Sequence, residues 1–444
     1  MSQTATSRPE IVIVGAGVIG VCAAFELSRA GHRVLLLDRD EPGSGASSGN
    51  ASHLAVANPF PIVEARSLWQ VPRMLADRTG PLRIDMRYLH RITPWLLRML
   101  WQLRPNAWRH SCRGLRRLND GSTAAWRRML ARIDASDLLR VEGSLLVCES
   151  AAGERDLRAD VGKCEDWGVR AEYLDADGVR AREPALSSRI RGGLYFPDTG
   201  RFLDPLQTVQ QVFRAAREAG CEFRQTDVSE ISASDSGVRL TTGDGALEAE
   251  NVLIATGAHG KQLVRQATGV KVPLDTERGY HLMLPGERDR LRLPVASSER
   301  RFVMTPLTGG LRLAGTVEFA GLERPADMRR ARVLGEHAER MLEEGISRDG
   351  EDTWMGFRPT LPDCLPVIDR TGPGGRVLMA FGHHHLGLTQ AAVTAEILRD
   401  LYHGESEPAI PVAPYRLDRF GTPARGKPET SNPGTRTQGV VNES

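Results

Sequence analysis

The sequence predicts an α/β fold combined with an α+β region, arranged as two domains whose segments alternate along the chain. Residues 9–38 read as a strand, a glycine-rich turn, a helix and a second strand, which is the repeating unit of a parallel sheet. Short strand patterns such as GSLLVCES, YHLMLP and LRLAGTVEF recur later and indicate a mixed sheet. With 444 residues, the chain also exceeds what one hydrophobic core usually serves.

The first βαβ unit carries the GxGxxG spacing of a dinucleotide site. A β-branched run from Ile11 to Val14 predicts the first strand, and Val34 to Leu37 predicts a second strand that ends at Asp38. The first glycine permits a tight turn, the second lets the backbone approach a pyrophosphate, and the third lets the helix pack closely. The acid is placed to accept hydrogen bonds from an adenosine ribose. The unit predicts a Rossmann-like site for FAD or NAD, with candidate contacts at Gly15, Ala16, Gly17, Val18, Ile19, Gly20, Asp38 and Arg39.

Two further glycine-bearing segments favour a flavin. The loop from Gly43 to Leu54 is small and rich in hydroxyl groups, which suits backbone donors wrapped around a pyrophosphate and a flavin edge. A flexible surface loop is the alternative. The segment NVLIATGAHG, residues 251–260, predicts a buried strand that ends where a cofactor can approach the backbone. These segments and their surroundings add candidate contacts at Gly45, Ala46, Ser47, Ser48, Gly49, Asn50, Val228, Thr256 and Gly257.

The stretch GHHHLGLTQ, residues 382–390, could be a metal site, a catalytic base or the wall of a cofactor pocket. In an extended strand the middle histidine would face away from its two neighbours, so at most two could share a metal. The apolar-periodic run after Gly387 predicts a helix from near Thr389 to near Gly404. A helix N-terminus offers unpaired N–H groups and a partial positive charge. We therefore expect this stretch to face an anion rather than a metal.

The overall composition narrows the class of protein. The six cysteines are scattered, without CxxC pairs or zinc spacing, which favours a reduced compartment and a cytoplasmic protein. No run of 18 uncharged apolar residues is present, so no transmembrane helix is predicted. The net charge of +2 says little about partners, and no nucleic-acid partner is expected. The polar tails, residues 1–8 and 421–444, are expected to be disordered.

Six segments occur in the order found in one known family: IVIVGAGVIG, GASSGNAS, VLIATGAHG, VPLDTERGYHLML, WMGFRPTLPDCLPVIDR and GHHHLGLT. Over residues 9–420 the chain resembles the FAD-dependent D-amino acid oxidase superfamily, and most of all its bacterial D-amino acid and hydroxyproline dehydrogenases. The resemblance implies an FAD-binding domain formed by residues 9–80, 200–262 and 353–420. It implies a substrate domain formed by residues 81–199 and 263–352.

The resemblance also implies roles for single residues. Arg358 would hold a substrate carboxylate in two parallel hydrogen bonds. The Tyr280 hydroxyl would form a hydrogen bond with the substrate, and His53 and His385 would lie beside the substrate; the alternative for each is a side chain that only satisfies its own fold. The histidine stretch would lie along the flavin, where N–H donors stabilise the negative charge of the reduced ring. The contacts implied there are Gly382, His383, Leu386, Gly387, Leu388 and Thr389.

From the resemblance we expect FAD-dependent oxidative deamination of a D-amino acid or a D-configured cyclic imino acid, such as a proline or hydroxyproline. Hydride would pass from the α-carbon to flavin N5, giving an imine and then a 2-oxo acid, with electrons handed to a quinone or another carrier. Non-covalent FAD is expected, because covalent members carry their cysteine near the position of Gly356. Three alternatives stay open: an O2-using glycine, sarcosine or D-amino acid oxidase, a nicotinamide-dependent dehydrogenase, and a non-catalytic flavoprotein.

A basic, tryptophan-bearing region bears on the electron acceptor. Residues 88–110 are apolar and flanked by arginine, and eleven arginines but only one acid lie between Arg87 and Arg132. Such a helix suits an anionic lipid surface, with its rings at headgroup level and its guanidinium groups directed outward. The functional interpretation is contact with the inner face of a membrane that holds the quinone. The alternative is a helix packed on the substrate domain with its arginines in solvent.

Overall fold

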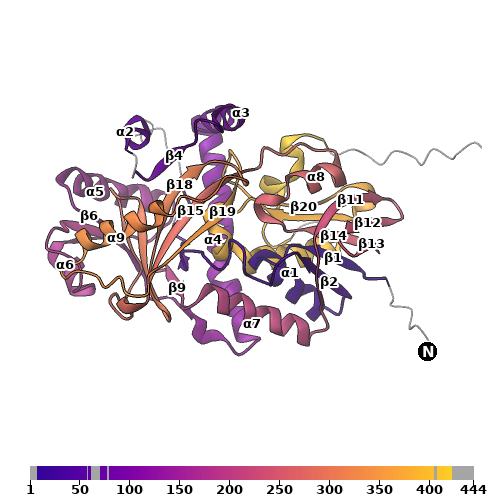
Figure 1. Cartoon of the computed structure of the whole chain (residues 1–444), viewed down its shortest axis with the longest axis horizontal. Helices are drawn as coiled ribbons and strands as arrows, with labels where there is room; N and C mark the ends of the chain where they lie inside the picture. The colour runs from indigo at the N-terminus through magenta and orange to yellow at the C-terminus, as the bar shows by residue number, and fades with distance from the viewer. Residues whose placement is uncertain (1–7, 58, 62–70, 78–79, 405–407, 423–444) are drawn as a thin grey trace, which may run out of the picture.

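The computed structural model describes residues 8–57, 59–61, 71–77, 80–404 and 408–422. Within these residues the strands form two large sheets and two small ones. Figure 1 shows the large sheets on either side of the long helix α4 (Pro105–Ala131). This combination of α/β and mixed-sheet layers confirms the predicted fold class. The predicted disordered tails lie outside the described residues, apart from Arg8, Gly421 and Thr422.

A six-stranded sheet contains the N-terminal βαβ unit. Its order is β10–β2–β1–β14–β21–β20, and all neighbours are parallel except the edge pair of β20 and β21. Its strands are β1 (Ile11–Val14), β2 (Val34–Asp38), β10 (Glu222–Gln225), β14 (Asn251–Ile254), β20 (Val367–Thr371) and β21 (Val377–Phe381). The strands β1 and β2 and the helix between them, α1 (Val18–Arg29), lie where the sequence predicts them.

Both faces of this sheet are covered. Alternate residues of β1 point to opposite layers, with Ile11 and Ile13 packed on α1, α4, α7 and α10, and Val12 and Val14 packed on α8 and a small antiparallel sheet. Burial on both faces explains why the inner strands β1 and β21 are continuous apolar runs, whereas the edge strand β10 is polar and mostly exposed. The covering elements are α7 (Pro205–Glu218), α8 (Lys261–Thr268), α10 (Gly387–His403), β11 (Val228–Ser234), β12 (Gly237–Thr242) and β13 (Gly245–Ala249).

The second large sheet has nine described strands, in the order β19–β15–β18–β17–β16–β6–β8–β7, with β4 paired to β18. They are β4 (Leu82–Ile84), β6 (Ser144–Cys148), β7 (Glu172–Asp175), β8 (Gly192–Phe196), β15 (Asp275–Leu284), β16 (Val295–Ser297), β17 (Phe302–Leu307), β18 (Gly310–Phe319) and β19 (Asp352–Thr360). Helices α5 (Ala151–Asp166), α6 (Ala176–Arg182) and α9 (Arg329–Met341) pack on it. The predicted domain division stays a prediction. That division groups β19 with the FAD-binding segments, whereas β19 pairs with β15 in this sheet.

Short elements connect the two large sheets. The strands β3 (His53–Leu54), β5 (Leu139–Arg140) and β9 (Gly200–Phe202) form a small sheet. Between β3 and α4 the described chain forms two helices, α2 (Val71–Ala76) and α3 (Leu89–Gln102). In α3, Ile92 and Trp95 pack against Phe319, whereas Leu97 and Trp101 are exposed. Among the described residues, no helix combines the length and apolar character that crossing a membrane requires.

Candidate active site

A cavity of about 1060 Å³ opens between the two large sheets. One wall is formed by the turns at the carboxyl ends of β1, β2, β14 and β21, which is the edge where open α/β sheets bind ligands. The other wall is formed by β15, β18 and β19. This volume is at the upper end of the range for ligand pockets, so the cavity has room for an extended cofactor together with a small substrate.

The turn after β1 brings bare backbone to the cavity. Gly15 has a φ of +107°, and a Cβ there would lie 2.5 Å from the carbonyl oxygen of Ala255. A Cβ on Gly20 would lie 1.8 Å from the Gly15 oxygen, so glycine is what lets α1 pack on the turn. Helix α1 starts after Gly17, which has no side chain to cap it, and the first helical N–H donates to Ser47 Oγ at 2.9 Å. The arrangement fits a pyrophosphate held at a helix N-terminus.

Asp38 lies at the end of β2 on the same wall. Its Oδ2 accepts a hydrogen bond from the Ala16 N–H at 2.6 Å, and its Oδ1 accepts one from the Asp40 N–H at 3.1 Å. These bonds hold the carboxylate at the cavity edge, where the sequence predicts a ribose. The Nη2 of Arg39 lies 3.2 Å from Nε2 of His259, a cavity residue that the sequence analysis did not single out.

The loop from Gly43 to Leu54, called the flavin loop below because the sequence predicts that it wraps the flavin, is fixed by side chains from the nine-stranded sheet. Three consecutive carbonyls, those of residues 48–50, accept hydrogen bonds: Arg312 Nη1 donates to the first and third at 2.9 and 2.7 Å, and His281 Nδ1 donates to the second at 3.0 Å. The Trp354 ring packs directly on the Cα of Gly49, where a Cβ would lie 2.3 Å from it. Burial lowers the pKa of His281 to about 3 and that of Arg312 to about 10, so the imidazole is neutral and carries its proton on Nδ1.

The histidine stretch is a turn, so the extended geometry used to orient its side chains is wrong. Strand β21 ends at Phe381, Gly382 has a φ of +83°, and His384–Leu386 form a 3-10 turn. His383 Nε2 lies 3.1 Å from Thr394 Oγ1, whereas Nδ1 of His385 is buried without a hydrogen-bond partner. Helix α10 starts at Gly387, two residues before the predicted start, has no side-chain cap, and ends before Gly404.

Three of the cavity histidines are neutral because they are desolvated. Burial lowers the pKa of His383 and of His385 to about 3, and that of His53 to about 4. His53 Nε2 lies 3.1 Å from Ser144 Oγ. Among the described residues, no three His, Cys, Asp or Glu side chains are placed to hold a metal ion. These imidazoles can shape the pocket without adding charge to it.

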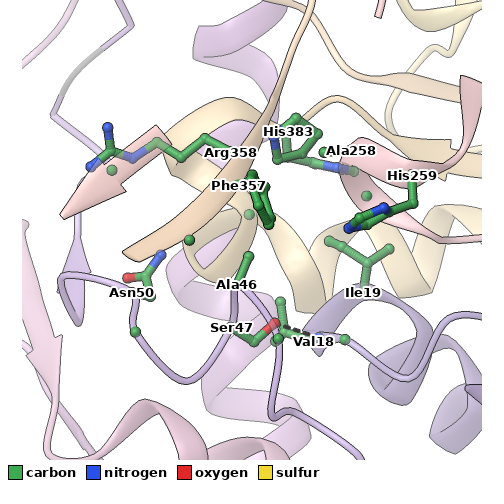
Figure 2. A pocket seen from close by; sticks show the side chains of 18 of the residues that line it. Val18, Ile19, Ala46, Ser47, Asn50, Ala258, His259, Phe357, Arg358 and His383 are labelled. Carbon is green, nitrogen blue, oxygen red and sulfur yellow. Dashed lines mark hydrogen bonds between the residues drawn. The ribbon is translucent and has the colours of Figure 1, made fainter. Parts of the chain in front are cut away.

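Arg358 faces the cavity from β19 with most of its donors free. Its guanidinium lies over Gly279 of β15, where a Cβ would approach Nη2 to 2.2 Å. Its Nη1 donates to the Thr316 carbonyl at 3.1 Å, and no described carboxylate forms an ion pair with it. Figure 2 shows Arg358 on the opposite side of the pocket from Val18 and Ile19, which follow the glycine turn. Burial lowers the pKa of this guanidinium, which makes a bound anion favourable there.

Tyr280 also lines the cavity, but its hydroxyl is already engaged. It donates to Glu318 Oε2 at 2.6 Å and is almost fully buried. Burial and Glu318 raise its pKa to about 12. The predicted substrate contact of this hydroxyl stays a prediction; while the bond to Glu318 holds, the hydroxyl oxygen can only accept a hydrogen bond from the substrate.

Most of the other predicted contacts line the cavity. They are Gly15, Ala16, Gly17, Val18, Ile19, Asp38, Arg39, Gly45, Ala46, Ser47, Gly49, Asn50, Val228, Thr256, Gly257, His383 and Gly387, together with His53 and His385. The predicted residues behind the lining are Gly20, Ser48, Gly382, Leu386, Leu388 and Thr389. Of these, Thr389 accepts a hydrogen bond from the Ala55 N–H at 3.2 Å and so ties the segment after β3 to α10.

Several cavity residues were not predicted. Glu277, Gly279, Thr316 and Trp354 all belong to the strands of the second wall. Gly279 and Glu277 lie one and three residues before Tyr280, and Thr316 lies on β18, so strand alternation around the predicted residues could have found only Trp354, four residues before Arg358. Arg312 could not be found this way, because its partners lie more than 260 residues away in sequence.

The fold and the cavity define a dinucleotide-binding oxidoreductase. The model of the DAO family, described as FAD dependent oxidoreductase, matches residues 10–401. The chain therefore belongs to this family, and it is an FAD-dependent enzyme. This removes the ambiguity between FAD and NAD that the βαβ unit leaves open.

Relatives cover nearly the whole chain. It is similar to a D-amino-acid oxidase of Bradyrhizobium diazoefficiens, at 33% identity over 92% of this chain and 98% of the relative. It is similar to a D-amino acid dehydrogenase of Cereibacter sphaeroides, at 30% identity over 94% and 96%. Glycine oxidase from Geobacillus kaustophilus has a similar structure, with a TM-score of 0.70, 23% identity and coverage of 93% and 99%, which supports the fold.

Proposed function

We propose that this chain is an FAD-dependent dehydrogenase of D-amino acids or D-configured cyclic imino acids such as proline and hydroxyproline. The observation that carries this proposal is the cavity-facing guanidinium of Arg358, which has no carboxylate partner among the described residues. A desolvated guanidinium is stabilised by a bound anion, and a planar carboxylate can accept two parallel hydrogen bonds from it. The names of the relatives, D-amino-acid oxidase and D-amino acid dehydrogenase, support an amino acid as the source of that carboxylate.

In this mechanism the residues of the chain bind the substrate and the cofactor and hold them in a fixed orientation. Bound FAD supplies an acceptor for the hydride that leaves the α-carbon of the substrate. Arg358 holds the substrate carboxylate in two hydrogen bonds and so limits rotation of the α-carbon. The uncapped start of α10 at Gly387 offers positive potential to an electron-rich ring. The imine product then hydrolyses to a 2-oxo acid and ammonia, which needs no nucleophile from the protein.

We infer that FAD is held without a covalent bond. At Gly356, where covalent relatives are expected to carry cysteine, a Cβ would lie 1.9 Å from the Trp354 ring. No cysteine of the described chain lines the cavity. Precipitating the protein with acid should release all of its flavin into the supernatant, whereas flavin that stays with the pellet would contradict the inference.

Anaerobic reduction of the flavin tests the substrate class. The purified yellow protein is mixed with D-amino acids, their L-enantiomers, glycine, sarcosine, and D-configured proline and hydroxyproline. We expect bleaching by one or more D-configured compounds, with the matching L-enantiomer as the control. Bleaching by L-enantiomers alone, or by no amino acid at all, would contradict the proposal.

An O2-using oxidase is the second candidate, favoured by the relative named D-amino-acid oxidase. The two candidates differ in how the reduced flavin is reoxidised. A dehydrogenase should reoxidise slowly in air and quickly with a soluble quinone. Near-stoichiometric peroxide at each turnover would assign the chain to the oxidases instead.

We propose that α3 contacts an anionic membrane surface, which would bring the enzyme to a quinone. Leu97 and Trp101 are 62% and 61% exposed, although the opposite side of the helix packs on the nine-stranded sheet. The guanidinium of Arg104 lies 3.3 Å from the centre of the Trp101 ring, so a cation accompanies the apolar face. Apolar rings beside guanidinium groups suit the boundary between headgroups and acyl chains.

Flotation with vesicles tests the membrane contact. Unmodified protein should float with vesicles that contain anionic lipid, and high salt should weaken the binding. The double variant Leu97→Ser and Trp101→Ser should stay at the bottom of the gradient while keeping its FAD. Vesicles of zwitterionic lipid alone serve as the control. Binding that is unchanged in the double variant would contradict the proposed contact.

A further inference from the structure

A second charged group faces the cavity and has no assigned role. Glu277 on β15 is 4% exposed and lines the cavity. Its Oε1 accepts a hydrogen bond from Thr360 Oγ1 at 3.1 Å, but its Oε2 is buried without any hydrogen-bond partner. A buried carboxylate oxygen that lacks a donor is costly, and native proteins rarely keep one without a reason. The free oxygen therefore points to a ligand that brings its own donor.

The pairing of β15 and β19 places this carboxylate beside the guanidinium. Glu277 is directly opposite Arg358, and the next pair on the same face is Gly279 opposite Gly356. Residues directly opposite each other in antiparallel strands have Cβ atoms about 5 Å apart. The absence of side chains at the two glycines lets the Arg358 guanidinium lie over Gly279 and the Trp354 ring lie over Gly356. Arg358 nevertheless donates to the Thr316 carbonyl, and no ion pair joins it to Glu277.

A short relay orients the carboxylate. The Thr360 hydroxyl contacts both Glu277 Oε1 and His384 Nε2, and it has only one proton to donate. Thr360 donates to Glu277 Oε1, so the Nε2–H of His384 donates to Thr360, and Nδ1 of His384 lies 3.7 Å from the same carboxylate oxygen. His384 adopts a φ of +55°, a conformation that a non-glycine residue keeps only when its surroundings hold it there. The relay holds Oε1 and leaves Oε2 free.

We propose that Glu277 and Arg358 together recognise the two charges of an amino acid zwitterion. The guanidinium binds the carboxylate, and Glu277 Oε2 accepts a hydrogen bond from the α-ammonium group or from the protonated ring nitrogen of a cyclic imino acid. The α-carbon is then fixed between two anchors on neighbouring strands. This inference rests on the proposed function and extends it, because it makes Glu277 the residue that separates amino acids from other carboxylic acids.

Matched ligands isolate the contribution of the ammonium group. D-alanine is paired with propionate and D-proline with cyclopentanecarboxylate; the pair used is the one whose amino acid reduces the flavin of the unmodified protein. The dissociation constant of the amino acid comes from anaerobic rapid-reaction reduction, and that of the carboxylate from the shift in flavin absorbance. Losing a hydrogen bond between charged groups predicts a roughly 10- to 100-fold weaker amino acid complex in Glu277→Gln. Binding of the carboxylate should change by less than about twofold, because that ligand makes no use of Oε2.

Three variants complete the experiment. Arg358→Met should weaken both ligands, and Thr360→Val should weaken only the amino acid, by less than Glu277→Gln does. Glu183→Gln changes a buried carboxylate that does not line this cavity and that accepts hydrogen bonds from the backbone of Arg292 and Leu293, so it should alter neither constant. The inference is overturned if Glu277→Gln weakens both ligands equally, weakens neither, or loses its FAD. A wild-type flavin that no amino acid reduces is a different result, because it overturns the proposed function itself.

Discussion

Among single residues, Arg358 and Glu277 carry opposite charges on neighbouring strands without neutralising each other. The resemblance implied the role of Arg358, because the motif around it is local in sequence. Glu277 was missed even though it lies three residues before Tyr280, which was predicted. Its significance depends on a missing hydrogen bond and on the strand opposite, and neither can be read from the sequence.

Replacing Arg358 with lysine tests whether substrate binding requires the two-pronged hydrogen-bonding geometry of the guanidinium in addition to its positive charge. Lys keeps the positive charge but cannot make two parallel hydrogen bonds. We expect the dissociation constant of the amino acid to rise roughly 10- to 100-fold, because a hydrogen bond to a charged group contributes about 1.5–3 kcal/mol. Rapid-reaction reduction measures this constant. A variant that binds the amino acid as well as the unmodified protein would contradict the assignment.

Gly15 was predicted from its spacing, and the structure supplies the physical reason. Gly15→Ala would place a side chain at a φ of +107° and against the Ala255 carbonyl. We expect a loss of about 1–3 kcal/mol in the free energy of unfolding and weaker FAD binding. Gly162→Ala is the control, because a Cβ there meets nothing within 4 Å and the position is helical. Equal stability of the two variants, measured by denaturant unfolding, would rule out strain at the turn.

At the scale of elements, the sequence predicts units that are local and misses contacts that join distant strands. The βαβ unit and the helix after Gly387 were predicted correctly, because glycine spacing and apolar periodicity are local signals. The histidine stretch was oriented wrongly, because the strand ends at Phe381 and two residues with positive φ turn the chain. The hydrogen bonds from β15 and β18 to the flavin loop could not be predicted, because they depend on how the two large sheets pack against each other.

Removing the hydrogen bonds that Arg312 donates to the flavin loop should make the loop more mobile. Arg312→Gln cannot reach both the Ser48 and the Asn50 carbonyls, so the loop that wraps the cofactor loses its fixed position. We expect roughly tenfold weaker FAD binding, equivalent to about 1.4 kcal/mol. Titration of FAD into the stripped protein, followed by flavin fluorescence, measures the change. Arg288→Gln, which alters an exposed arginine, is the control. Unchanged affinity in Arg312→Gln would show that the loop is held by other contacts.

At the scale of the whole molecule, the site exists only where two sheets face each other. The fold class could be predicted, because the βαβ unit and the alternating strands each indicate their own layer. The pairing of β19 with β15 could not be predicted, because β15 lies about 75 residues earlier in the chain. Burial of the site has a consequence for the entire protein, since desolvated histidines make stability depend on pH.

Acid should unfold the protein through its buried histidines. Those with a pKa lowered to about 3 or 4 are His53, His281, His383 and His385. Their pKa in the unfolded chain is about 6.5, so below that pH the unfolded state binds protons that the folded state does not. The stability they contribute is present above pH of about 6.5 and falls toward pH 4, by at most about 1.4 kcal/mol per pH unit for each histidine. Glu183 opposes this trend in the same window, because burial raises its pKa to about 7.

Denaturant unfolding at pH 7, 6 and 5 with saturating FAD measures the slope. His383→Gln should flatten it, because glutamine does not titrate and can still bond to Thr394. His90→Gln is the control, since His90 is exposed. A slope that is the same in both variants, or stability that rises on acidification, would contradict the linkage.

The central claim is that the glycine turns and Arg358 enclose one flavin and one substrate carboxylate. A crystal structure of the FAD-loaded protein with a bound carboxylic acid tests it most directly. The claim predicts a pyrophosphate at the N-terminus of α1, the flavin ring between the two sheets, and the ligand carboxylate on the Arg358 guanidinium above the ring. A carboxylate bound elsewhere, or a flavin ring outside this cavity, would contradict it.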